Sequence, residues 1–583
     1  MNNRYTWATE DIYQDINSWQ KDYNIAESYK GFEEFKGNLG KKEVFIACMK
    51  KLQKVSRIIE KLSVYAYMKH DEDTSNSVYD GLSSKIGMLA VDFSSKTAFI
   101  TPELTALDEQ VLNDYILDKD LKDYDYFLKE LLKKKKHVLS EKEETLLSMA
   151  SEPLSCFKDI FKKTDNADLP LSEFELDGEK FELSHGLYSV YLQSSNRKLR
   201  ELAFKNYYKA YLSLENVISA TYIGSVKKDV FYSKAKNYNS SLERALSSED
   251  VDASVYTNLI ESVNDNLWLL HDYVLERKKA LNLDEMHMYD ISVPMVESAD
   301  LKLDYEKAYD LVIEGLKPLG EEYKNLLQKA RNERWIDVYE KKGKRSGAYS
   351  IGVFDTHPYV LLNYQQTTHD VFTIAHEMGH AIHTYFSNQS QPYEKADYKI
   401  FVAEVASTVN EVLLIKHLIK NATDNKLKKY LLSYLMEMIR TTLYRQTQFA
   451  EFEQFSHQEV EQGTPITKDS LTEKYYSLNQ KYYGSEVVSD KEIGYEWLRI
   501  PHFYTAFYVY KYSTGIISAL SIAERILEEG EVAVKDYFKF LSSGGSDSPV
   551  ELLKIAGVDL TDKQTFKKAF KVFGDALEEF KKI

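Results

Sequence analysis

The scarcity of residues that end helices constrains the fold of this chain more than any other feature. Ten Pro and 23 Gly occur among 583 residues. Long segments between them place apolar residues at helical spacing, at 44–68, 111–132, 199–217, 255–281 and 303–332. The sequence therefore predicts a mainly α fold.

Chain length and one predicted hairpin set the expected domain organisation. At 583 residues the chain is too long for a single hydrophobic core. Residues 174–183 alternate between apolar and polar around an Asp-Gly pair, which is typical of a β-hairpin. We expect a helical N-terminal region over 1–185, ending at this hairpin, and a second region over 186–583.

A small β element is expected before one particular helix. Residues 348–354 and 359–364 have the composition of strands, and Asp355-Thr356-His357-Pro358 joins them. The chain then becomes helical at 367–370. The segment 359–364 is either a buried hairpin arm or an open edge that receives an extended peptide through main-chain hydrogen bonds. Both alternatives stay open at this point.

Charge and cysteine content exclude several classes of function. The net charge is −16, so a broad phosphate-neutralising surface is not expected, and nucleic acid is an unfavourable partner. Two cysteines, Cys48 and Cys156, fit a reducing compartment. No Cys-x-x-Cys occurs, so a metal site would use His and carboxylate ligands. Because the N-terminus lacks the apolar stretch of a signal peptide and no apolar run approaches membrane-spanning length, we expect a cytoplasmic protein without a membrane partner.

The segment 372–383 carries the chemistry. It contains His376-Glu377-Met378-Gly379-His380 and is predicted to be a helix. Residues four apart lie on one helix face, so His376 and His380 can point at a single ion, and zinc binds two imidazole nitrogens in this arrangement. Glu377 is rotated about 100° around the axis. Its carboxylate would lie beside the metal, where it can take a proton from water.

A catalytic zinc needs a third protein ligand. In the three-histidine arrangement the last histidine would stand where this chain has Phe386, and His383 lies too far along the helix to join both others. The apolar segment 401–411 offers Glu404 and Glu411, two acids seven residues apart on one face. Acids on a buried stripe are costly unless they are paired or bound to a cation. Glu404 is the predicted ligand. Glu411 is either an acceptor that orients a ligand histidine or a surface ion pair.

Together these residues resemble the thimet oligopeptidase and oligoendopeptidase F family of zinc peptidases. The spacing from the His376-Glu377-x-Gly-His380 motif to Glu404 and Glu411 carries the likeness. Three further segments resemble the oligoendopeptidase F branch: Ser346-Gly347-Ala348-Tyr349-Ser350 with 355–364, then 500–512, and 541–560. The resemblance covers roughly 200–580 and extends to the N-terminal helices. It implies a multi-helix, two-lobed body around a deep channel, one Zn²⁺ per chain, and cleavage of short unstructured peptides.

The resemblance also implies substrate-binding groups downstream of the metal. In the family a histidine and tyrosines there bind substrate and stabilise the oxyanion, and His502 and Tyr510 match them by position. Tyr504 is the counterpart of a second tyrosine, which in the family lies in a glycine-rich loop that is shorter here. A phenol hydroxyl is a suitable neutral donor to an oxyanion. Gly347, Tyr359, Val360 and Tyr508 are the candidate substrate contacts.

The predicted activity is therefore that of a zinc metalloendopeptidase. Glu377 acts as the general base, and Tyr510, with His502 or Tyr504, donates to the oxyanion. Two alternatives are an exopeptidase that grips a peptide terminus and a non-catalytic protein that has kept the fold. The chain has no Gly-x-Met-Glu-Asn stretch of the kind that zinc aminopeptidases use to hold the amino end.

Overall fold

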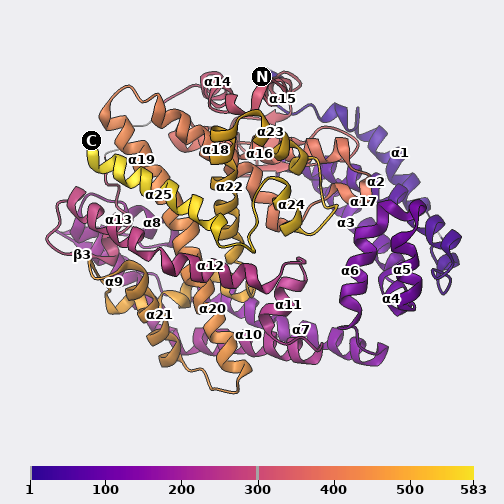
Figure 1. Cartoon of the computed structure of the whole chain (residues 1–583), viewed down its shortest axis with the longest axis horizontal. Helices are drawn as coiled ribbons and strands as arrows, with labels where there is room; N and C mark the ends of the chain where they lie inside the picture. The colour runs from indigo at the N-terminus through magenta and orange to yellow at the C-terminus, as the bar shows by residue number, and fades with distance from the viewer. Residues whose placement is uncertain (1–2, 30, 297–300) are drawn as a thin grey trace. The chain divides into compact units, whose positions relative to one another are not determined.

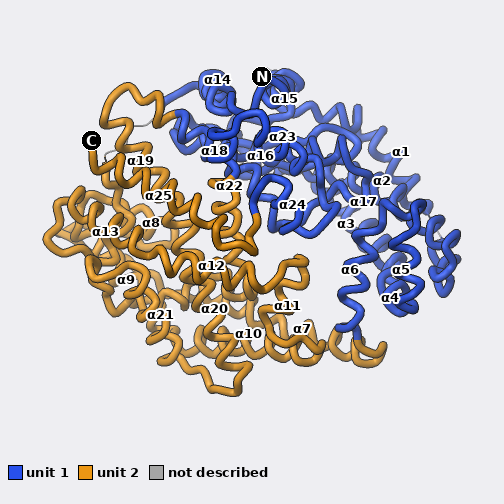
Figure 2. Tube along the Cα trace, in the orientation of Figure 1, with its two compact units in different colours: residues 1–138, 300–417, 522–558 blue, residues 139–299, 418–521, 559–583 orange. Residues whose placement is uncertain are grey.

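The computed structural model describes residues 3–29, 31–296 and 301–583, and these residues are mainly helical (Figure 1). The expected mainly α fold with small β-sheets is confirmed. By contacts the chain divides into two compact units (Figure 2). Unit 1 comprises residues 1–138, 300–417 and 522–558, and unit 2 comprises residues 139–299, 418–521 and 559–583. The predicted border at 185 differs from this division, because residues 1–138 cluster with the segment that carries the His-Glu-x-x-His motif.

Unit 1 is built from helices around a small sheet. Its strands are β4 (Ile336–Asp337), β5 (Tyr349–Ile351) and β6 (Tyr359–Leu361). Its helices are α1 (Ile16–Ser28), α2 (Lys42–Glu72), α3 (Ser77–Thr97), α4 (Ile100–Ala106), α5 (Glu109–Leu117), α6 (Asp125–Lys135), α14 (Tyr305–Gly315), α15 (Gly320–Asn332), α16 (Thr368–Ser390), α17 (Tyr393–Ala396), α23 (Glu531–Leu541) and α24 (Pro549–Ile555).

The described residues of unit 2 form helices and two short strand pairs. Its strands are β1 (Phe174–Leu176), β2 (Glu179–Phe181), β3 (Met286–His287) and β7 (Val487–Val488). Its helices are α7 (Glu141–Lys163), α8 (His185–Leu192), α9 (Arg197–Ser213), α10 (Glu215–Ala235), α11 (Ser241–Ser247), α12 (Ala253–Asp265), α13 (Leu267–Ala280), α19 (Asn425–Ile439), α20 (Arg445–Glu461), α21 (Lys468–Tyr483) and α25 (Gln564–Lys582). Helices α18 (Ile400–Lys420) and α22 (Tyr510–Glu529) each contribute residues to both units.

The predicted hairpin is present as β1 and β2, which pair antiparallel from Phe174↔Phe181 to Leu176↔Glu179. The two turn residues both have positive φ, 54° at Asp177 and 85° at Gly178. This is the backbone of the two-residue turn that matches strand twist, and an Asp-Gly pair adopts it readily. Local sequence alone specifies this element.

The strand order of the three-stranded sheet is β4-β6-β5. Strand β6 pairs parallel with β4 and antiparallel with β5, so both of its edges are occupied. Beneath it lies an apolar cluster to which the N-terminal segment contributes Trp7, Trp19, Leu62 and Tyr65 alongside Tyr359 and Leu361 of β6. The Trp7 Nε1–H donates to the Val360 carbonyl at 2.7 Å. The N-terminal segment is thus part of the core that supports the sheet.

Helix α16 begins at a capping box. Thr367 accepts from the Asp370 amide, and Asp370 accepts from the Thr367 amide at 2.9 Å. Its buried side chains pack against α14, β5 and α23 of the same unit. This burial fixes the rotation of α16 and therefore the face on which its histidines project.

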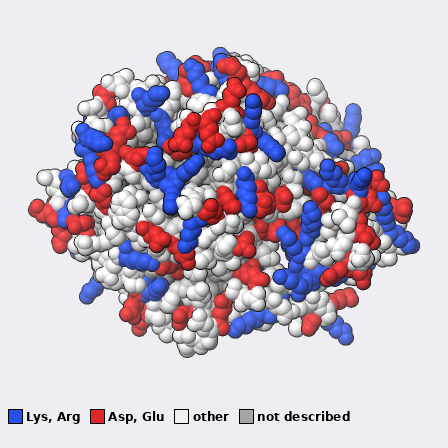
Figure 3. All heavy atoms as spheres, viewed as in Figure 1, with Lys and Arg blue, Asp and Glu red and all other residues white. Residues whose placement is uncertain are grey.

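The surface shows mixed charge on the face seen in Figure 3, where cationic and anionic side chains are interspersed. Among the described residues, no helix is both long enough and apolar enough to cross a membrane. Cys48 and Cys156 are both free thiols.

Candidate functional site

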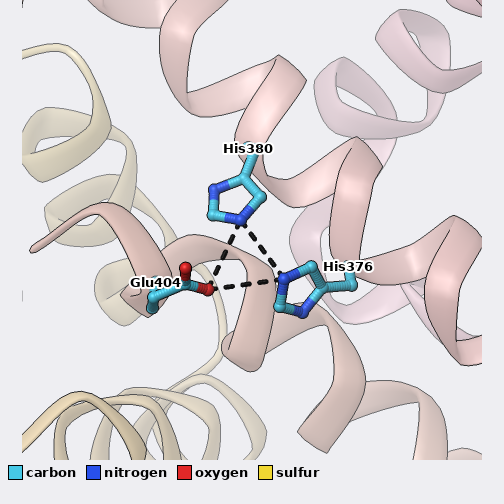
Figure 4. Close-up of side chains that lie close together, drawn as sticks. All are labelled: His376, His380 and Glu404. Atoms are coloured by element: carbon cyan, nitrogen blue, oxygen red, sulfur yellow. Dashed lines mark hydrogen bonds and ion pairs between the residues drawn. The ribbon is translucent and has the colours of Figure 1, made fainter. Parts of the chain in front are cut away.

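Three predicted ligands converge in unit 1. His376 and His380 project from α16, and Glu404 projects from α18 (Figure 4). The two Nε2 atoms lie 3.2 Å apart, and each lies 3.4 Å from Glu404 Oε2. Zinc bonds of about 2.0–2.1 Å in a tetrahedron place neighbouring ligand atoms about 3.3–3.4 Å apart. The three donor atoms therefore fit three corners of a tetrahedral zinc site and leave the fourth for water or substrate.

The charge around His376 favours a cation at this point. Burial lowers the pKa of the ring, but the carboxylates of Glu404 and Glu411 outweigh burial and raise that pKa to about 10. Hydrogen bonding to His376 and His380 in turn holds the pKa of Glu404 well below its usual range. A metal ion would take the place of the proton that this environment otherwise stabilises on the histidine.

Glu411 contacts the far side of the same ring. Its Oε1 lies 2.6 Å from His376 Nδ1, which donates its N–H and so leaves the Nε2 lone pair directed at the metal position. Of the two alternatives for Glu411, the structure has the histidine-orienting contact.

Glu377 is buried beside the ligands, with 7% of its surface exposed. Burial raises the pKa of its carboxyl group; His376 and His380 lower it, while Glu404 and Glu411 raise it further. A raised pKa brings the carboxylate closer in basicity to neutral pH, which suits a group that accepts and then returns a proton.

Gly379 allows the two ligand helices to approach each other. A Cβ atom at this position would lie 2.5 Å from Ser407 Cα and 2.7 Å from the Ala406 carbonyl oxygen of α18. Asn410 fastens the contact, because its Nδ2 donates to the Ala375 carbonyl at 2.9 Å and its Oδ1 accepts from Tyr323 at 2.9 Å. Neither role was predicted from the sequence. A glycine inside an apolar helix was the available signal for the first.

His383 is not a ligand, in agreement with its spacing. Its ring is 1% exposed and stacks on Tyr398 with ring centres 3.8 Å apart. Burial lowers its pKa to about 3.

The sheet excludes one of the two alternatives for 359–364, the open strand edge. Tyr359 and Val360 lie in the central strand β6, where the Val360 amide donates to Trp335 and its carbonyl accepts from Trp7. Neither residue offers a free backbone edge to a substrate. Among the described strands of this sheet, β4 and β5 are the outer ones, so β5 has one edge that no other described strand of the sheet occupies. Gly347, just before β5, has φ 87° and no atom within 4 Å of where a Cβ would stand.

The remaining candidates lie in unit 2, on the segment 501–512. His502 is exposed, its Nε2 lies 3.3 Å from the Tyr512 hydroxyl, and Tyr508 packs against both rings. Burial and Lys158 lower the pKa of His502. Tyr512 was not predicted as a site residue, because in the sequence it is one of several neighbouring tyrosines.

Tyr504 and Tyr510 are buried instead, with 6% and 1% of their surfaces exposed. Tyr504 stacks on Phe161 with centres 4.4 Å apart, and Tyr510 packs 5.2 Å from the ring of Tyr256. Burial raises the pKa of both hydroxyls, so both remain protonated donors.

A buried carboxyl group holds the backbone of this segment. Phe507 has φ 55°, an unfavourable conformation for a residue with a side chain, and its amide donates to Glu453 Oε1 at 3.0 Å. Burial raises the pKa of Glu453 well above its usual range. Glu453 was missed in the sequence because only the fold brings it to residue 507.

Comparison with known proteins agrees with this geometry. The sequence model of peptidase family M3 matches residues 190–572, and the oligopeptidase F N-terminal model matches residues 103–170. Oligopeptidase PepF of Bacillus subtilis is 43% identical over 99% of this chain and 87% of its own length. The crystal structure of oligoendopeptidase-F from Enterococcus faecium is 33% identical, covers 98% of each chain and has a TM-score of 0.72. A solved structure from Chlamydophila abortus is 35% identical over 100% of this chain and 98% of its own, with a TM-score of 0.96.

With His376, His380 and Glu404 placed to bind a metal, the chain belongs to peptidase family M3 and is an oligopeptide-cleaving metallopeptidase of the oligoendopeptidase F type.

Proposed function

We propose that the chain is a zinc endopeptidase that holds one Zn²⁺ through His376, His380 and Glu404 and hydrolyses internal bonds of short, unstructured peptides. The observation that carries the proposal is the spacing of 3.2–3.4 Å among the three ligand atoms, which is close to the edge of a tetrahedral zinc site. Two imidazoles and one carboxylate are also the donor set of catalytic zinc in peptidases.

A bound zinc ion supplies Lewis acidity, which polarises a carbonyl and lowers the pKa of water. Glu377 accepts the proton of the attacking water and delivers it to the leaving amine. Burial raises the pKa of its carboxyl group, which makes the carboxylate a stronger base for this proton transfer. Glu411 keeps His376 in the tautomer that presents Nε2.

His502, Tyr504 and Tyr510 are proposed as donors to the oxyanion, on the strength of the family resemblance. Tyr508 and Gly347 are proposed as substrate contacts. We propose that β5, and not β6, receives the substrate backbone, because an extended peptide needs an unpaired strand edge. Main-chain hydrogen bonds to such an edge require no particular substrate side chain.

The decisive test compares Glu377→Gln with Glu404→Ala. We expect Glu377→Gln to retain zinc, measured by elemental analysis, and to lose about 10²–10⁴-fold in kcat, since the isosteric amide cannot take a proton. Glu404→Ala should lose zinc as well as activity. Turnover near wild type by Glu377→Gln, or full zinc content in Glu404→Ala, would contradict these roles.

Substrate class needs a separate assay. Quenched peptides with both ends blocked, of graded length, should be cut internally, whereas an intact folded protein should not. An enzyme that requires a free terminus would leave the blocked peptides uncut. Elemental analysis of the purified protein identifies the metal, and reconstitution with zinc after chelation should restore cleavage.

We also propose a cytoplasmic location, supported by the two free thiols Cys48 and Cys156, which persist as thiols in a reducing compartment. Fractionation of cells that make the protein tests this directly: recovery from an extracellular or membrane fraction would oppose it.

A further inference from the structure

A polar cavity lies wholly within unit 2. Its volume is about 300 Å³, at the lower end of the range for small-molecule pockets, roughly 300–1,000 Å³. Its walls come from α8, α9, α20, the end of α21, the 3₁₀ segment Lys491–Arg499 and residues 288–292. None of the residues assigned above to the metal site or to catalysis lines it.

Two arginines in this wall share one carboxylate. Arg445 Nη2 donates to Glu496 Oε1 at 2.6 Å, and Arg499 Nη2 donates to the same oxygen. The other oxygen accepts from the Tyr475 hydroxyl at 2.6 Å. Burial opposes ionisation of Glu496, but the two guanidiniums hold its pKa at about 2, so it is an anion. Two positive charges against one negative charge leave the cavity wall with an excess cation.

Hydrogen-bond donors and acceptors in the wall also remain unsatisfied. Tyr208 is 1% exposed and lines the cavity, where its hydroxyl lies beside the Arg499 guanidinium but makes no well-aligned hydrogen bond with the described residues. Arg499 Nε is likewise buried without a partner in the described part of the chain. A buried polar group without a well-formed hydrogen bond destabilises the folded state, so native proteins rarely keep one unless something outside the chain satisfies it.

The guanidinium groups are held in position before any ligand arrives. Arg445 lies over the Phe449 ring at 4.8 Å, and Arg499 lies over the Tyr188 ring at 6.0 Å. Each guanidinium has five N–H donors in a rigid plane, which matches the paired oxygens of a carboxylate or phosphate. The fixed planes, the excess positive charge and the buried Tyr208 hydroxyl beside Arg499 are complementary to a small oxyanion.

We propose that this cavity binds a small organic anion, whose carboxylate or phosphate oxygens accept hydrogen bonds from Arg445, Arg499 and Tyr208. The ligand supplies the negative charge that Glu496 alone does not, and its size is limited by the enclosed volume. This site is separate from the proposed zinc chemistry and does not depend on it.

The test uses calorimetric titration of the zinc-loaded protein with succinate and with glycerol 3-phosphate, up to about 10 mM, beyond which binding counts as absent. At least one should bind the wild type. Tyr208→Phe should weaken that binding about tenfold or more, since it removes one donor, while leaving the thermal midpoint unchanged or higher. Arg445→Gln should abolish binding, yet it leaves Glu496 paired with Arg499 and Tyr475.

Tyr537→Phe is the matched control. Tyr537 is fully buried in unit 1, and its hydroxyl also has no hydrogen-bond partner among the described residues, but it lines no part of this cavity. It should bind the anion as the wild type does. Preference for succinate or for glycerol 3-phosphate identifies a carboxylate or a phosphate ligand. Absence of binding by both anions, or equal binding by wild type and Tyr208→Phe, would overturn the proposal, because the second result would mean that the anion binds outside this cavity.

Discussion

The ring of His376 is held on two sides, with Glu411 at Nδ1 and Glu404 facing Nε2. Replacing Glu411 by Ala removes an acceptor that touches no metal but fixes the direction of the ligand lone pair. We expect zinc affinity to fall about 10–100-fold, measured by competition with a chromogenic chelator. Glu411→Gln keeps an oxygen acceptor, so its zinc affinity should fall less than that of Glu411→Ala. Equal zinc affinity in all three proteins would reject an orienting role.

Glu60 provides a pH-dependent prediction away from the metal. Burial raises its pKa to about 7, its Oε1 accepts from the Phe354 amide at 3.2 Å, and its Oε2 is buried without a partner among the described residues. The folded state therefore holds a proton that the unfolded chain releases near its ordinary pKa, and stability falls as the pH rises from about 4.5 to 7.

Glu60→Gln removes this titration. In the wild type the free energy of unfolding falls by on the order of 3 kcal/mol once the pH exceeds 7. We therefore expect the variant to have a higher thermal midpoint than the wild type at pH 8 and no advantage at pH 4. A constant difference between the two proteins across this range would show that Glu60 does not titrate as described.

At the scale of elements, the contact between α16 and α18 depends on Gly379. Gly379→Ala introduces a methyl group 2.5 Å from Ser407 Cα, so the helices must separate. Overpacking of this kind costs about 1–3 kcal/mol, and a displacement of about 1 Å at a catalytic site can cost about 100-fold in rate. We expect reduced zinc content and a large loss of kcat/KM.

Gly87→Ala on α3 is the matched control for this substitution. Gly87 is a helical glycine of the same unit, and a Cβ there would meet no atom within 4 Å. It should be neutral or stabilise by about 0.5–1 kcal/mol, because alanine restricts the unfolded chain. Wild-type zinc binding by Gly379→Ala would show that α18 can move without disturbing Glu404.

The elements also show what sequence reasoning can reach. The hairpin turn at Asp177-Gly178 and the row His376-His380 follow from local backbone geometry, so both were predicted. Asn266 divides the predicted helix 255–281 into α12 and α13, with non-helical φ and ψ of −117° and 17°. The central position of β6 was not predictable, because strand order depends on which distant segments pair. Gly379 and Glu453 were missed for the same reason: their partners are 28 and 54 residues away.

At the scale of the whole molecule, each compact unit is assembled from three separate stretches of chain. A chain that begins at residue 186 contains every metal ligand and the whole matched M3 segment. It nevertheless lacks Trp7, Trp19 and Leu62, which cover the apolar side of β6. We expect this chain to aggregate and to lack fixed tertiary packing, as judged by gel filtration and near-ultraviolet circular dichroism. Elemental analysis should find less than one zinc ion per chain.

Supplying residues 1–185 as a second polypeptide during synthesis should recover part of the folded protein, because the missing surface is then available. A truncated chain that is monomeric, holds zinc and cleaves peptides would contradict the role assigned to the N-terminal segment. Such a result would also favour the border near residue 185 as a true folding boundary.

The hydrogen bond from Trp7 to Val360 joins residues 353 positions apart. During synthesis at about 5–20 residues per second, the ribosome makes the partner strand about 20–70 s after the tryptophan. Throughout that interval the apolar faces of α1 and α2 have no sheet to cover, so the nascent chain is a natural client for a chaperone that shields apolar surface. Trp7 is made long before its partner strand and is therefore among the last residues to reach its final place.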